Sequence, residues 1–226
     1  MQHTFESLIE SLNAEPGFEA DIVNSVISLD EYRLQAMRDA GFSPKLIVDI
    51  GGHIGSFAMF AKWVWPASKV ITVEPLPVNF ARLCNAVGGL PAVYPENAAI
   101  VGEPIAGDYV EVFLSDDGNT AAASTMRTAG RESIKARAMS ICELLSKHKW
   151  PDVDLLKLDC EGEEGPILRD LARMGFLDCV DTIVGEWHFV HNISIIEDSL
   201  RQTHLLELHR HDWEWGAFFA KRRLVG

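Results

Sequence analysis

The fold of this chain is decided by the stretch Val48-Asp49-Ile50-Gly51-Gly52-His53-Ile54-Gly55. An apolar run at 46–50 leads into it, and a run of helical character at 55–65 follows it. The next apolar run, 69–74, ends in an acidic residue. A strand, a glycine turn, a helix and a second strand closed by an acid are typical of a doubly wound, Rossmann-like α/β sheet.

The spacing of the glycines distinguishes between cofactors. A dinucleotide fingerprint requires G-x-G-x-x-G, so that the backbone can approach a pyrophosphate, but His53 occupies the position of the second glycine. Glycines still allow the backbone to come close to a ligand, and the N-terminus of the next helix attracts a carboxylate. The loop therefore favours S-adenosylmethionine, which has no phosphate, although the glycines alone are also compatible with a simple tight turn.

The rest of the cofactor is expected beyond the second and third strands. Glu74 is positioned to accept hydrogen bonds from both ribose hydroxyls. Asn97 follows the third strand and is a candidate for bonding the adenine, or alternatively for capping a turn, while the small Ala98 leaves room for the ring. The predicted cofactor-binding residues are Asp49, Gly51, Gly52, His53, Gly55, Glu74, Pro75, Asn97 and Ala98.

Charge and composition exclude several kinds of partner. The 226 residues include 33 acids and 20 bases, giving a formal charge of −13, whereas binding to a nucleic-acid backbone needs clustered Lys and Arg. The basic cluster at 221–223 is expected to be a solvated strand end. No signal peptide is recognisable, and no run reaches the roughly 18 apolar residues of a membrane span. We therefore expect a cytoplasmic protein without nucleic-acid or membrane partners, and a homo-oligomer stays open.

The chain divides into two parts by pattern. Residues 1–44 carry apolar side chains mostly three and four apart, which predicts a helical N-terminal cap segment. Residues 45–226 alternate between strands and helices, and they predict a Rossmann-like domain of seven strands ending in an antiparallel hairpin. Residues 103–139 interrupt this alternation with strand-like runs around a turn at 115–119 and a loop at 120–128, so an inserted antiparallel hairpin is expected there.

Three stretches resemble the FkbM-type methyltransferases: Asp49 to Gly55, Glu74-Pro75 with Asn79-Phe80, and Leu156-Lys157-Leu158-Asp159-Cys160-Glu161-Gly162-Glu163. The likeness covers about residues 45–190, and Lys-x-Asp-x-Glu-Gly is its most specific part. The resemblance implies an S-adenosylmethionine-dependent enzyme that O-methylates sugars, polyketides or other secondary metabolites. The chain departs from the family at Gly52-His53, where Ala-Asn is common, so His53 is expected to meet the methionine end of the cofactor differently.

A second set of polar residues is expected at the C-terminal edge of the sheet, where open α/β sheets bind their ligands. Lys157, Asp159 and Glu161 are two residues apart and share one face if their strand continues through them. Glu186 and His188 are placed in the same way at the end of the next strand. The two strands are expected to be neighbours, which brings acids and a histidine to one opening beside the methyl donor.

These residues suggest two kinds of chemistry. Methyl transfer to a hydroxyl needs a base, and His188 is the first candidate, because an unperturbed imidazole titrates near neutral pH. Asp159 and Glu161 are the second candidates. A divalent metal held by these three residues and Glu186 is an alternative, but it is not favoured, since the acids can instead neutralise Lys157.

The sequence therefore predicts an S-adenosylmethionine-dependent O-methyltransferase that acts on a small-molecule hydroxyl. Two alternatives belong to other classes: a nicotinamide-dependent oxidoreductase and a non-catalytic cofactor-binding protein. His53 at the second glycine position argues against the oxidoreductase.

Overall fold

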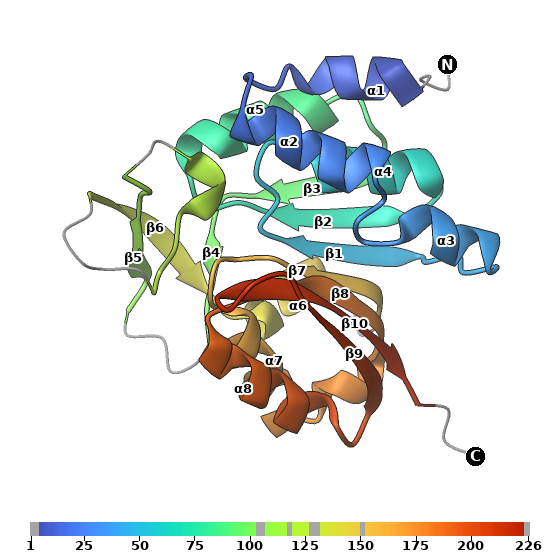
Figure 1. Cartoon of the computed structure of the whole chain (residues 1–226), viewed down its shortest axis with the longest axis vertical. Helices are drawn as coiled ribbons and strands as arrows, with labels where there is room; N and C mark the ends of the chain where they lie inside the picture. The colour runs from blue at the N-terminus through green and yellow to red at the C-terminus, as the bar shows by residue number, and fades with distance from the viewer. Residues whose placement is uncertain (1–4, 103–106, 117–118, 127–131, 150–151, 224–226) are drawn as a thin grey trace.

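The computed structural model describes residues 5–102, 107–116, 119–126, 132–149 and 152–223, and a seven-stranded sheet runs through its centre (Figure 1). In order across the sheet, the strands are β3 (Val93–Glu96), β2 (Lys69–Val73), β1 (Leu46–Ile50), β7 (Val153–Leu158), β8 (Val180–His188), β10 (Trp215–Arg222) and β9 (His204–Arg210). The strands from β3 to β8 are parallel, and β10 is antiparallel to both of its neighbours. The predicted doubly wound sheet with a C-terminal antiparallel hairpin is confirmed.

Helices cover both faces of the sheet, so strand β1 is buried along its whole length (Figure 1). Successive residues of the strand point to opposite faces: Ile47 packs in one core with Phe60, and Val48 packs in the other with Leu168. The first core lies under α4 (Ser56–Val64) and α5 (Pro77–Val87), and the second under α6 (Ile141–His148), α7 (Glu164–Arg173) and α8 (Val190–Leu200).

The N-terminal segment forms short helices that pack on α4 and share its core (Figure 1). Asp30 stabilises the start of the last of them, because its carboxylate accepts hydrogen bonds from the backbone N–H groups of Leu34 and Gln35. Leu8, Ile27 and Leu34 are all buried in the core beneath. The elements are α1 (Phe5–Leu12), α2 (Phe18–Val23), a π-helix η1 (Asn24–Ser28) and α3 (Leu34–Asp39).

The expected insertion is a small second sheet beside the main one (Figure 1). Its strands are β4 (Ala99–Ile100), β5 (Tyr109–Phe113) and β6 (Ser133–Met139), and a short 3₁₀ helix, η2 (Thr120–Ala122), follows β5. β5 and β6 form the predicted antiparallel pair, while the parallel pairing of β4 with β6 is an addition to the prediction. Parts of the predicted turn (117–118) and loop (127–128) lie outside the described residues.

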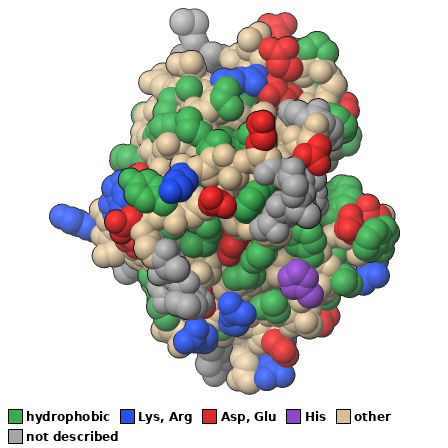
Figure 2. Space-filling view, turned by 90° about the vertical axis from the view of Figure 1, so that its left-hand side faces the viewer, with side chains coloured by type: hydrophobic (Ala, Val, Ile, Leu, Met, Phe, Trp, Pro, Cys, Tyr) green, Lys and Arg blue, Asp and Glu red, His purple; other side chains and the backbone are tan. Residues whose placement is uncertain are grey.

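The surface carries no broad basic strip on the face seen in Figure 2, where Lys and Arg are scattered among acidic and hydrophobic side chains. At the end of β10, Lys221 is paired with Asp181, and Arg222 donates to the carbonyl oxygen of Asp178. These two residues of the predicted solvated cluster thus have partners in the fold. Among the described residues, no helix combines the length and apolar character needed to cross a membrane.

The contact between β7 and β8 depends on a glycine and gives a first prediction. A Cβ atom at Gly185 would overlap the carbonyl oxygen of Leu158. We expect Gly185→Ala to lower the free energy of unfolding by about 1–3 kcal/mol, because overpacking forces the backbone to shift. Urea denaturation of both proteins measures the difference.

Gly89→Ala is the matched control for this variant, since a Cβ atom there meets no atom within 4 Å. It is expected to change the free energy of unfolding by no more than about 0.5 kcal/mol, as surface substitutions usually do. If both variants lost the same free energy of unfolding, the close approach of β7 and β8 would not be the reason why position 185 requires glycine.

Candidate active site

The glycine turn after β1 fits against two neighbouring strands. Gly51 and Gly52 both donate backbone hydrogen bonds to the carbonyl oxygen of Val73. Gly51 has φ +85°, and a Cβ atom there would overlap the carbonyl oxygen of Asp159. The turn also brings His53 to φ +48°, a conformation that is uncommon outside glycine. The glycine at position 51 therefore allows a close backbone approach, as predicted, and the group that comes close to it in this structure is the carbonyl oxygen of Asp159.

A buried ion pair supports this turn from behind. Lys157 Nζ donates to the carbonyl oxygen of Gly51 at 2.6 Å and lies 3.3 Å from Asp49 Oδ1 and 3.5 Å from Asp159 Oδ2. Burial disfavours the charged ammonium, but the carboxylates of Asp49 and Asp159 outweigh it and raise the pKa of Lys157. Asp49 is fully buried and also accepts from Thr72 Oγ1 at 2.7 Å. The side chain of Asp49 thus faces Lys157 behind the turn, and Gly51, unlike Asp49, lines the cavity.

Glu74 follows β2 and faces the glycine turn. Its Oε2 accepts from the backbone N–H of His53 and its Oε1 from that of Leu76, each at 2.9 Å. Burial raises the pKa of the carboxyl to about 7, against the lowering effect of these hydrogen bonds. Asn79 Nδ2 also donates to Oε1, at 3.4 Å. A carboxylate has about four acceptor positions, so these three bonds leave capacity for one ligand hydroxyl at least. Pro75 and Ala98, which are also in the predicted set, line the same cavity as Glu74.

The side-chain amide of Asn97 bonds to the backbone after β2. Its Nδ2 donates to the carbonyl oxygens of Glu74 at 2.8 Å and Pro75 at 3.1 Å. The amide therefore holds the backbone that carries Glu74, and Asn97 is not among the residues that line the cavity. These contacts are of the structural kind that the sequence offered as the alternative, and a bond from Asn97 to an adenine stays a prediction.

The ring of His53 is buried and neutral. Burial lowers its pKa to about 4. Nε2 lies 3.2 Å from Thr120 Oγ1, while Nδ1 is buried and has no hydrogen-bond partner among the described residues. A buried polar atom without a partner costs free energy, so the ring is prepared for a ligand group on the cavity side. Gly55, the last residue of the predicted loop, has φ +98° and begins α4.

One cavity of about 520 Å³ joins the glycine turn to the ends of β7 and β8. Small-molecule sites commonly have volumes of about 300–1,000 Å³. Helices α2 and η1 form one wall with Phe18, Ile22 and Val26, and Trp215 of β10 lines the cavity too. The predicted residues that reach it are Gly51, His53, Glu74, Pro75, Ala98, Asp159, Glu161 and His188.

The predicted acids Asp159 and Glu161 both line this cavity, but they lie in a turn after β7 and not in an extended strand. β7 ends at Leu158, and Glu161 lies in a turn with φ +55°, followed by Gly162 with φ +123°. The expectation that Lys157, Asp159 and Glu161 share one strand face is therefore wrong for Glu161. The turn nevertheless brings Glu161 Oε1 to 3.4 Å from His188 Nε2.

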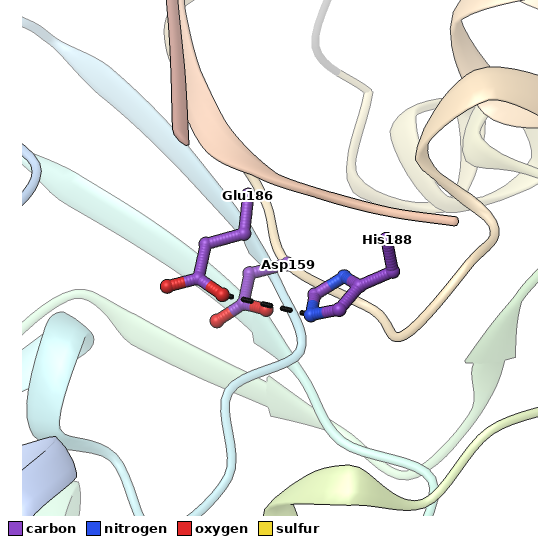
Figure 3. A group of neighbouring side chains, drawn as sticks. All are labelled: Asp159, Glu186 and His188. Carbon is purple, nitrogen blue, oxygen red and sulfur yellow. Dashed lines mark ion pairs between the residues drawn. The ribbon is translucent and has the colours of Figure 1, made fainter. Parts of the chain in front are cut away.

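His188 lies between the buried carboxylate of Glu164 on one side and the half-buried Glu186, shown beside it in Figure 3, on the other. Its Nδ1 lies 3.0 Å from Oε1 of Glu164, which is fully buried and also accepts from the backbone N–H groups of Cys160 and Gly162. Its Nε2 lies 3.5 Å from Glu186 Oε2. Burial alone would lower the pKa of His188, but Glu164 outweighs it and raises the pKa to about 10. The near-neutral pKa of an unperturbed imidazole, for which His188 was chosen as the first candidate base, therefore does not apply in this environment, and the role of His188 stays a prediction.

The carboxylates around His188 have divergent properties. Burial, together with the charges of Asp159 and Glu31, raises the pKa of Glu186 to about 10. Burial also acts to raise the pKa of Asp159, but Lys157 reverses this effect and keeps it below its ordinary value. The pKa values of the two acids are thus shifted in opposite directions, downward for Asp159 and upward for Glu186. Pairs of acids with separated pKa values are common where protons are moved.

Sequence reasoning missed three residues of this site. Tyr32 donates from its hydroxyl to Asp159 Oδ2 at 2.9 Å, and Glu31 lines the cavity beside it, both from the N-terminal segment. No local motif marks them, because they reach the site only through the packing of that segment on α4. Glu164 had a signal, since it lies in the run after β7, but acids in a first helical turn are also expected from the helix dipole.

The order of strands, the glycine turn after β1 and the acid after β2 define a Rossmann-like fold, which solved methyltransferase structures share. Residues 49–210 match the methyltransferase FkbM domain, and this fold in a methyltransferase implies S-adenosylmethionine binding. The chain belongs to the FkbM methyltransferase family, as the sequence resemblance predicted.

Two curated relatives are fungal methyltransferases. Methyltransferase 1 of Beauveria bassiana is 27% identical over 203 residues, covering 78% of this chain and 77% of the relative. Methyltransferase sdnD of Sordaria araneosa is 26% identical over 178 residues, covering 64% and 67%. A candidate O-methyltransferase from Klebsiella pneumoniae has a similar fold, with a TM-score of 0.53 at 12% identity over 97% of this chain and 90% of that one.

The buried ion pair behind the glycine turn gives a second prediction. Lys157→Met leaves the carboxylate of Asp49 buried without its cation, which typically costs about 3–5 kcal/mol of unfolding free energy. The double variant Asp49→Asn/Lys157→Met removes both charges and is expected to regain a large part of that loss. Chemical denaturation of the single and double variants measures the coupling. Additive losses would show that the two side chains do not stabilise one another.

Proposed function

We propose that this methyltransferase uses S-adenosylmethionine to O-methylate a hydroxyl group of a small molecule. One observation carries the proposal: a single cavity connects the glycine turn and Glu74 with the carboxylates around His188. A methyl donor at the first end and an acceptor at the second then share one enclosed space. By its family resemblance, the acceptor is a sugar or another secondary metabolite.

The residues at the donor end suit S-adenosylmethionine. Gly51 lets the backbone line the cavity without a side chain. The N-terminus of α4, which follows the glycine turn, is our candidate for attracting the methionine carboxylate. Glu74 is our candidate for the ribose hydroxyls. Nδ1 of His53 has no protein partner among the described residues, which suits a ligand donor on this side. The same loop is a poor match for a pyrophosphate, which disfavours the oxidoreductase alternative.

When bound, S-adenosylmethionine supplies a methyl group activated by a positively charged sulfur. The chain must then orient the acceptor, with reacting atoms about 3–3.5 Å apart, and take up the hydroxyl proton. Asp159 and Glu161 are our candidates for the proton acceptor, since Asp159 is ionised and both line the cavity. His188, protonated in the ligand-free protein, is our candidate for holding the acceptor oxygen through Nε2.

Size and charge support a small acceptor. The cavity volume of about 520 Å³ falls within the range of small-molecule sites. The formal charge of −13 disfavours binding to a nucleic-acid backbone. The apolar wall of Phe18, Ile22 and Val26 offers packing for the non-reacting part of an acceptor.

Turnover of hydroxylated acceptors tests the proposal directly. The purified protein is incubated with S-adenosylmethionine and a panel of glycosides and phenols, and S-adenosylhomocysteine is followed by mass spectrometry. We expect stoichiometric formation of S-adenosylhomocysteine and an O-methylated product. Cofactor binding without turnover on any acceptor of the panel supports the non-catalytic alternative instead.

Glu74 gives a third prediction. A hydrogen bond to a charged group contributes about 1.5–3 kcal/mol, so Glu74→Gln is expected to weaken S-adenosylmethionine binding by about 10- to 100-fold in calorimetry. Glu96→Gln is the matched control, because that acid ends β3, pairs with Lys147 and does not line the cavity. The role of Glu74 is refuted if both variants bind as tightly as the wild type.

The raised pKa of Glu74 gives a fourth prediction. Ribose hydroxyls donate hydrogen bonds to the ionised form, which becomes the minor form as the pH falls through about 7. Affinity for the cofactor is therefore expected to be high at pH 8 and to fall below pH 7, by at most about tenfold per pH unit. Calorimetry at pH 6 and 8 measures this change, which should be absent in Glu74→Gln.

A further inference from the structure

We infer that Asp159, Glu186 and His188 form a divalent-cation site, which takes an acceptor hydroxyl and a neighbouring oxygen of the same molecule. This inference rests on the proposed function, since it assigns the place of the acceptor within that site. Magnesium or manganese is the expected cation, because both accept carboxylate oxygen and imidazole nitrogen as ligands.

The three side chains converge from two adjacent strand ends (Figure 3). Glu186 and His188 are on the same face of β8, and Asp159 follows β7, its parallel neighbour. One ligand atom from each of the three residues lies within 4.8 Å of the others. Two carboxylates and one imidazole on the wall of a cavity leave the other side of a cation open to a ligand.

The ring of His188 is oriented as in a metal ligand. Metal-bound histidines almost always direct their second ring nitrogen at a carboxylate, carbonyl or water, which fixes the ring. Here Nδ1 faces Glu164 at 3.0 Å, and Glu164 is itself fixed by the backbone N–H groups of Cys160 and Gly162. Nε2 is thereby directed at Asp159 and Glu186. A cation bound at Nε2 replaces its proton. The cation, in place of the imidazolium, then holds the acceptor oxygen, and Asp159 becomes a ligand, which leaves Glu161 as the proton acceptor.

The charge of the cavity is a separate argument for a cation. Its described lining contains eight Asp and Glu residues and no Lys or Arg, and the protonated ring of His188 is the positive group that a cation there replaces. The nearest ammonium, that of Lys157, is bonded to the carbonyl oxygen of Gly51 and shared between Asp49 and Asp159. Buried carboxylates are normally paired or bound to metals. The sulfonium of the methyl donor brings one positive charge into the cavity. A divalent cation near β8 supplies the further positive charge that balances the carboxylates there.

A cation at this position defines the kind of acceptor. It lowers the pKa of a hydroxyl bound to it, and the hydroxyl proton passes to Glu161 while the electron pair stays on the oxygen. Glu161 lies beside His188 and outside the three ligands, so it is available as the proton acceptor. Two neighbouring oxygens chelate a cation better than one, so vicinal diols, as in sugars, are the expected substrates.

Manganese binding tests the inference without a turnover assay. The full chain, freed of metals with EDTA and saturated with S-adenosylhomocysteine, is titrated with Mn²⁺, and the spectrum of free Mn²⁺ is followed by electron paramagnetic resonance. We expect one Mn²⁺ per chain, displaced by Mg²⁺. Glu186→Gln removes a ligand and is expected to abolish this site. Glu164→Gln is expected to weaken it by about 10- to 100-fold, as for other residues that orient a ligand.

Glu143→Gln is the matched control, because Glu143 is an exposed acid paired with Arg137 away from the cavity. It is expected to bind Mn²⁺ like the wild type. Wild-type protein that binds S-adenosylhomocysteine but no Mn²⁺ at millimolar concentration overturns the cation site and leaves the proposed function standing. Equal Mn²⁺ affinity in the wild type and Glu186→Gln also overturns it. Failure to bind S-adenosylhomocysteine is the distinct result that contradicts the proposed function.

Discussion

The site depends on one ammonium group. Lys157 Nζ lies between Asp49 of β1 and Asp159 of the loop after β7, and it donates to the carbonyl oxygen of Gly51 between them. A lysine buried in an apolar strand is stable in its charged form only with such partners. The same contacts fix the backbone of the glycine turn and the carboxylate of Asp159 at the end of β7. One charge therefore sets the spacing between these two parts of the cavity wall.

Much of the fold was predictable because its signals are local. The run from Val48 to Gly55 combines a buried strand with glycines that only a tight turn requires, and the acid after β2 completes the pattern. The parallel β4–β6 pairing was not predictable, since β4 has two residues and its partner is far away in the chain. Two residues are too few to show a period.

The sequence predicted several of the residues that line the cavity, but it did not predict their pKa values. The spacing of Glu186 and His188 placed both on one face of β8, as found. Their protonation depends on burial and on partners such as Glu164 and Glu31, which arrive through tertiary packing. Sequence spacing gives no dielectric and no distance, so it offers only the unperturbed pKa of an imidazole, whereas Glu164 raises the pKa of His188. Sequence spacing could not show the bonds of Asn97 either, because Asn97 follows β3 and the carbonyl groups that accept from it follow β2.

The apolar wall of the cavity and its polar residues come from different parts of the chain. Residues 49–210 match the family domain, whereas Phe18, Ile22, Val26 and Glu31 belong to the helical segment before it. That segment touches the reacting end chiefly through the hydroxyl of Tyr32 on Asp159. The apolar part of the wall thus comes from a segment that can vary in sequence without any change in the glycine turn or the strand ends, which is how one fold can carry sites of different specificity.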